Sequence, residues 1–156
     1  MANENLTLQQ GIVARIEQLT MTGSLDEASQ TRLSTLCNEA VRNAEIHKDA
    51  DSWHLAALAW YEHSEGSTRR SKMIRFCEAR ALEIDPAHQF ARQYLAYQQF
   101  DDGEYEDALG SLELLKPEYF EDLDQHWRVL KNRELVLAAQ LHLARDVPLE
   151  ELKSQL

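Results

Sequence analysis

Apolar residues recur at intervals of three and four along most of the chain, and this spacing constrains the fold more than any other feature. In the segment 6–21 the recurring apolar residues are Leu8, Ile12, Ile16 and Leu19. Such spacing places side chains on one face of an α-helix. It predicts helices over 6–21, 24–47, 53–63, a fourth ending at residue 84, and then 87–100, 104–116 and 118–145. No segment has the alternation typical of a strand, so we expect an all-α fold.

Short breaks separate these segments and show where each helix should end. Asp85 precedes a proline, which pushes its backbone out of helical geometry. Ser24 followed by Glu27 has the spacing of a capping box at a helix start. The last long segment should be one unbroken helix, and a final short turn is expected through Ser154. An apolar stripe follows this helix, formed by Leu123, Trp127, Leu130, Leu137, Leu141 and Ala144.

The segment 81–108 carries the most specific pattern, ALEIDPAHQFARQYLAYQQFDDGEYEDA. A helix ending in Asp-Pro, a helix with Leu beside a small residue, and then Gly-x-Tyr-x-x-Ala resemble the junction between two tetratricopeptide repeats. The matching residues are Ala81, Leu82, Ile84, Pro86, Leu95, Ala96, Gly103, Tyr105 and Ala108. The chain departs from the family at Gln99 and Leu112, where an aromatic residue is usual.

The resemblance implies an α-solenoid of stacked antiparallel helix pairs. About three repeats would cover 6–47, 50–86 and 87–117, and a capping segment would cover 118–156, all in one domain over 1–156. A four-helix bundle would show similar apolar stripes. The Asp-Pro and Gly-x-Tyr-x-x-Ala pair, at the separation seen here, favours the repeat architecture.

Charge and composition exclude several classes of partner. The formal net charge of −11 opposes binding to nucleic acid and to anionic membranes. The first residues lack the basic and apolar regions of a secretory signal, and no segment has the length of apolar sequence that a membrane span needs. Cys37 and Cys77 are too few for a disulfide framework and fall on apolar helix faces, where free thiols act as small hydrophobes. We expect a cytoplasmic protein.

Catalytic and metal-binding motifs are missing from the sequence. The six His are scattered, and no pair has the spacing of a zinc-protease helix. There is no phosphate-binding glycine loop and no nucleophile elbow. We therefore expect no enzyme activity, no metal and no cofactor.

In tetratricopeptide proteins the first helix of each pair lines a concave groove that holds a peptide or a helix. The resemblance places seven candidate residues in such a groove: His54, Leu58, Tyr61, Phe90, Gln93, Tyr97 and Asp101. Aromatic side chains beside Gln and acid suit an apolar or basic segment of a partner protein. Tyr61 and Phe90 have an alternative role, which is to pack the seams between repeats.

The function predicted from these features is that of an adaptor, a protein-interaction module without catalysis. Two alternatives stay open: a small acidic secretion chaperone of similar build, and a regulatory domain of a longer enzyme. The sequence fixes neither the partner nor the oligomeric state.

Overall fold

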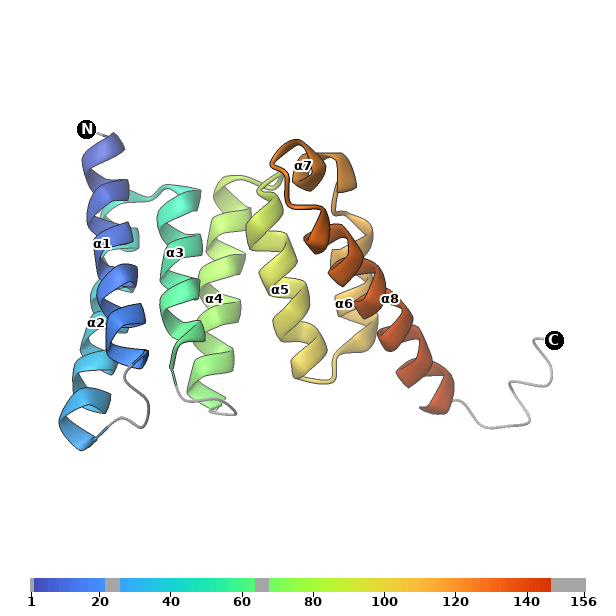
Figure 1. The fold of residues 1–156 in the computed structure, drawn as a ribbon, viewed down its shortest axis with the longest axis horizontal. Helices are drawn as coiled ribbons and strands as arrows, with labels where there is room; N and C mark the ends of the chain where they lie inside the picture. Colours follow the sequence, from blue (N-terminus) through green and yellow to red (C-terminus); the bar gives the residue numbers. More distant parts are fainter. Residues whose placement is uncertain (1, 22–25, 64–67, 147–156) are drawn as a thin grey trace. The chain divides into compact units, whose positions relative to one another are not determined.

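The computed structural model describes residues 2–21, 26–63 and 68–146. Within these ranges the chain forms eight α-helices and no strand (Figure 1). They are α1 (Ala2–Thr20), α2 (Glu27–His47), α3 (Ala50–Tyr61), α4 (Thr68–Ile84), α5 (Gln89–Asp101), α6 (Tyr105–Glu113), α7 (Pro117–Asp122) and α8 (His126–Asp146). The predicted all-α class is confirmed.

The chain divides into two compact units, Met1–Ala91 and Arg92–Leu156. The first unit contains α1 to α4 and the beginning of α5, and the second contains the rest of α5 with α6, α7 and α8. The boundary falls inside α5. The single domain expected over 1–156 stays a prediction.

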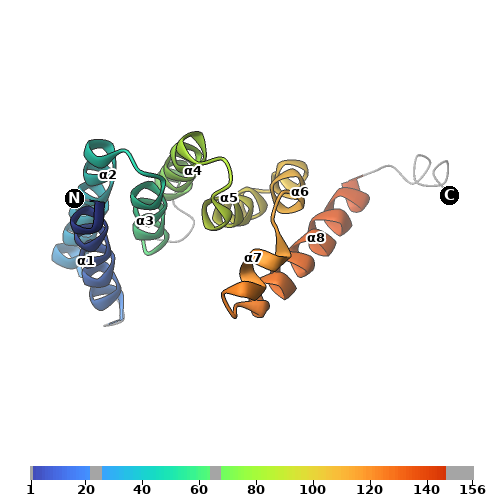
Figure 2. The ribbon, with the colours of Figure 1, turned by 90° about the horizontal axis from the view of Figure 1, so that it is seen from above.

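In the first unit, consecutive helices pack side by side and alternate in direction (Figures 1 and 2). The α3 helix contacts α1, α2 and α4, so it lies at the centre of the unit. Three of its four alanines, Ala56, Ala57 and Ala59, are completely buried. Small side chains let helix backbones approach closely, and the large buried residues fill the remaining space. These are Ile12, Ile16, Trp53, Trp60 and Ile74.

One buried amide connects three helices of this unit. The Gln9 side chain of α1 is completely buried, and its Nε2 donates to the backbone oxygens of Ala40 in α2, at 2.9 Å, and Ser52 in α3, at 2.8 Å. Its Oε1 accepts from Asn43 Nδ2 at 3.0 Å. Both protons of this amide and one of the two lone pairs on its oxygen are therefore used, as expected of a buried amide.

Aspartates begin two of the helices. The Asp26 carboxylate accepts from Ser29 N at 2.7 Å and caps α2, and the Asp49 carboxylate accepts from Ser52 N at 2.8 Å and caps α3. The predicted capping box depended on Ser24, which lies outside the described residues, as does the short turn expected through Ser154.

In the second unit, α8 packs against α6 and α7. The helices α5 and α6 meet through a hydrogen bond from Ser111 Oγ to Gln99 Oε1 at 2.7 Å. The ring of His142 stacks on Tyr105, with 4.3 Å between centroids and 5° between planes. Gly103 turns the chain between α5 and α6 with a φ of 80°, which a residue with a Cβ adopts only at a cost.

The prediction of one helix over 118–145 is wrong, because α7 ends at Asp122 and α8 begins at His126. Asp124 has a left-handed φ of 57°. Its N–H donates to Glu121 O at 2.9 Å, and Gln125 N donates to Phe120 O at 2.8 Å. These two bonds form a Schellman motif, which ends a helix without needing glycine. The periodic apolar pattern crosses the break, so spacing alone did not reveal it.

Candidate functional site

Four of the predicted groove residues lie in the first unit, and their side chains differ in exposure. His54 is buried, whereas Leu58, Tyr61 and Phe90 are half-buried. The structure brings His54 and Phe90 together in a stacked arrangement with 6.1 Å between ring centroids. The Arg70 guanidinium carbon lies over the Tyr61 ring, 5.0 Å from the ring centroid. These aromatic contacts therefore help to hold the first unit together, while the rings of Tyr61 and Phe90 stay partly exposed to solvent.

His54 belongs to a buried polar cluster. Its Nδ1 lies 2.9 Å from Glu78 Oε1, and the Glu78 side chain has no exposed surface. Burial raises the pKa of Glu78 well above its usual value, because the charged form loses its hydration. His54 also contacts His88, with 5.3 Å between the centroids of the two rings. The Nε2 atom of His88 in turn lies 2.8 Å from Asp51 Oδ1. The Glu78 carboxyl has no exposed surface, and its contact with His54 joins α4 to α3.

The other three predicted residues lie in the second unit, where two of them meet at one amide of α8. Gln93 is completely buried; its Nε2 donates to Asn132 Oδ1 at 2.8 Å, and its Oε1 accepts from Arg128 Nη1 at 2.7 Å. The Tyr97 hydroxyl donates to the same Asn132 oxygen at 3.2 Å. Burial raises the pKa of Tyr97 to about 12. Asp101 is exposed.

The seven residues thus fall into two sets, and the polar groups of three of them are already engaged within their own unit. A partner would have to break existing hydrogen bonds to use His54, Gln93 or Tyr97. Of the rest of the predicted set, Asp101 is exposed, and Leu58, Tyr61 and Phe90 are half-buried.

A different surface, on α8, is open. Four large apolar side chains of this helix are exposed: Trp127 by 57%, Leu130 by 53%, Leu137 by 67% and Leu141 by 54%. Their spacing places them on one face of the helix. The opposite face packs inwards through Val129, Leu135 and Ala139, which are buried. We call the four exposed residues the α8 stripe. The sequence pattern showed these residues but not that they face solvent, because α8 is apolar on both faces.

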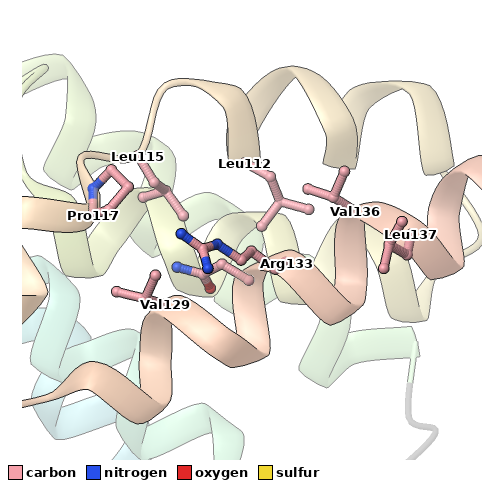
Figure 3. A pocket seen from close by; sticks show the side chains of 8 residues that line it. Leu112, Leu115, Pro117, Val129, Arg133, Val136 and Leu137 are labelled. Atoms are coloured by element: carbon pink, nitrogen blue, oxygen red, sulfur yellow. The ribbon is translucent and has the colours of Figure 1, made fainter.

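An apolar pocket adjoins the α8 stripe (Figure 3). It has a volume of about 360 Å³ and lies between α8 and the end of α6 with the residues that follow it. Its apolar lining consists of Leu112, Leu115, Pro117, Val129, Val136 and Leu137, and Asn132 and Arg133 complete it. Leu137 belongs to both the pocket and the stripe, so the two adjoin at this residue, and the exposed Glu134 lies on the stripe's face between Leu130 and Leu137. The volume is at the lower end of the range for ligand pockets, roughly 300–1,000 Å³.

Comparison with protein-family models, with curated proteins and with solved structures finds no match.

A metal site, a membrane span and a reactive thiol each place requirements on the described residues. Among them, no three His, Cys, Asp or Glu side chains lie close enough to hold a metal ion. No described helix has both the length and the apolar character needed to cross a membrane. Cys37 and Cys77 are unpaired and buried, as predicted. Burial raises the pKa of the Cys37 thiol to about 12 and raises that of Cys77 too, so neither provides a reactive thiolate at neutral pH.

Proposed function

We propose that this chain is a non-catalytic, cytoplasmic protein-interaction module of tetratricopeptide type, and that it holds a peptide or helix of a partner protein. The repeat architecture is supported by the Asp-Pro and Gly-x-Tyr-x-x-Ala pattern over 81–108 and by the packing of the first unit. There α3 contacts both helices of the preceding pair as well as its own partner α4, as expected when helix pairs stack.

The observation that carries the binding function is the α8 stripe with its adjoining pocket. Single exposed apolar residues are common on protein surfaces, but several on one helix face beside an apolar pocket support an interaction site. Leu130, Leu137 and Trp127 are each more than half exposed. Trp in particular is enriched among the residues that dominate binding energy at interfaces. A concave pocket beside such a stripe gives one side chain of a partner a place to be buried.

The test is a pull-down with mass spectrometry from cells that express the protein, using matched variants. L137S/L141S makes two exposed stripe residues polar, and Q140A changes an exposed residue between them on the same helix. All three are surface changes that should leave stability within about 0.5 kcal/mol, to be checked by circular dichroism. A partner that the native chain and Q140A capture, but L137S/L141S does not, supports the proposal. Equal capture by all three proteins contradicts it.

A further inference from the structure

Arg133 is a cation placed within the apolar surface. It is exposed on α8 and lines the pocket together with Val129, Val136 and Leu137 (Figure 3). Within the described part of the chain, its guanidinium has no hydrogen bond and no ion pair.

The neighbouring cations of α8 differ from Arg133 in this respect. Lys131 Nζ lies 3.8 Å from Glu134 Oε2. Arg128 donates to Gln93 Oε1 and, through Nε, to Gln125 Oε1, each at 2.7 Å. Among the described residues, none takes up the donors of Arg133, so they are available to a group from a partner.

We infer that the occupant of this surface is an amphipathic α-helix of a partner protein that carries a carboxylate beside its apolar anchor residue. The inference rests on the proposed function and adds the chemistry of the partner. The anchor would enter the pocket, and an Asp or Glu about one turn away would pair with Arg133. The guanidinium fork matches a carboxylate with two parallel hydrogen bonds. The apolar surroundings strengthen the pair by excluding water.

A helix of about four turns matches the length of the α8 stripe. The α8 stripe runs from Trp127 to Leu141, which at about 1.5 Å per residue is roughly 21 Å, or four turns. A partner helix lying along α8 would present apolar residues at intervals of three and four to match it.

Local charge favours a carboxylate at this site, although the chain as a whole is acidic. Between Trp127 and Leu141 the sequence contains the cations Arg128, Lys131 and Arg133 but a single acid, Glu134. Charges farther away than about 10 Å are largely screened at 0.1 M salt, so the cations beside Arg133 on α8 contribute to the field at its guanidinium together with the acids of α6 and α7. The basic partner expected from the net charge of −11 would meet this cationic stretch instead.

Two other occupants fit the same observations less well. A second copy of the chain would place the cationic stretch against itself, because a two-fold interface uses the same patch twice. An anionic membrane would attract the cations of α8 and accept the stripe, but the net charge of −11 opposes it.

Two synthetic helical peptides test the inference. They share leucines at helical spacing and differ only in carrying Glu or Lys at the flanking positions. Binding is followed by the emission of Trp127, the exposed one of three tryptophans, since Trp53 and Trp60 are buried. The native chain should bind the Glu peptide roughly tenfold more tightly than the Lys peptide, the effect of about one charge-assisted pair.

Variants of Arg133 identify the source of this preference. R133Q should bind both peptides about equally, and R133E should prefer the Lys peptide. R42Q makes the same charge change at an exposed position on α2 and should keep the native preference.

Three results would overturn the inference. The first is a native preference for the Lys peptide, and the second is a preference for the Glu peptide that survives in R133E. The third is burial of Trp127 by self-association or by phosphatidylserine vesicles without burial by the Glu peptide. If L137S/L141S abolishes the binding of both peptides while no charge preference exists, the inference fails and the proposed function stands. If L137S/L141S leaves the binding of both unchanged, the proposed surface fails as well.

Discussion

Replacing Gln9 with Leu should destabilise the first unit strongly, although the new side chain is apolar and of similar size. Gln9 makes three buried hydrogen bonds, to Ala40 O, Ser52 O and Asn43 Nδ2, at 2.9, 2.8 and 3.0 Å. Each is worth about 1 kcal/mol net, so their loss amounts to about 3 kcal/mol. The Asn43 amide then stays buried without its acceptor, which adds to the cost.

A double-mutant cycle isolates the shared bond. Asn43→Ala alone loses that bond, about 1 kcal/mol, whereas Gln9→Leu already includes it. The double variant should therefore be destabilised by about 1 kcal/mol less than the sum of the single variants. Urea unfolding followed by tryptophan fluorescence measures these free energies. A Trp127→Phe background confines the signal to Trp53 and Trp60, which lie in the first unit.

The matched control is Gln10→Leu, the same substitution one residue along, on an exposed position of α1. It should change the free energy of unfolding by less than about 0.5 kcal/mol. A Gln9→Leu variant as stable as Gln10→Leu would refute the reasoning. Strict additivity in the cycle would show that the Asn43 bond contributes nothing.

Two further predictions concern buried titratable groups. Because burial raises the pKa of Glu78 in the folded state, the unfolded chain binds fewer protons above the ordinary Glu pKa, and stability should fall as the pH rises towards the folded pKa. Glu78→Gln keeps an acceptor for His54 but cannot ionise. The native chain should therefore lose stability relative to this variant as the pH rises above about 5, by at most about 1.4 kcal/mol per pH unit. A difference in unfolding free energy that does not change with pH in urea unfolding would contradict this. Cys37 and Cys77 should react slowly with a thiol reagent in the folded protein and quickly in denaturant, and rapid labelling of the native protein would show that the helix faces carrying them open readily.

Much of the fold could be predicted because helix formation leaves a local periodic signal. The spacing of Leu8, Ile12 and Ile16 indicated α1, and Pro86 and Gly103 indicated where helices end. The break at Asp124 could not be predicted in this way, since it depends on a left-handed non-glycine residue inside an apolar pattern that continues on both sides.

The candidate site was harder to predict, because exposure is a property of packing between segments distant in sequence. Gln93 looked like a surface residue by its type, but it is buried against Asn132 and Arg128, 39 and 35 residues away in the chain. Leu137 belongs to the apolar stripe that the sequence shows, but its side chain is exposed, since α8 buries a different face. A polar residue such as Gln93 can be buried when distant segments of the chain provide its hydrogen-bond partners. A local sequence pattern does not identify those partners.

The positive-φ residues mark sites where the chain should tolerate few substitutions over evolution. Lys48, Gly103 and Asp124 each lie at the end of a helix, with φ of 55°, 80° and 57°. Glycine, Asn or Asp adopts this geometry at little cost, whereas β-branched residues do not. Related chains should therefore keep to this small group of residues at the counterparts of 103 and 124, even where the repeat pattern has drifted. In distant relatives, the residue types at these helix ends should then be conserved better than the residues within the helices.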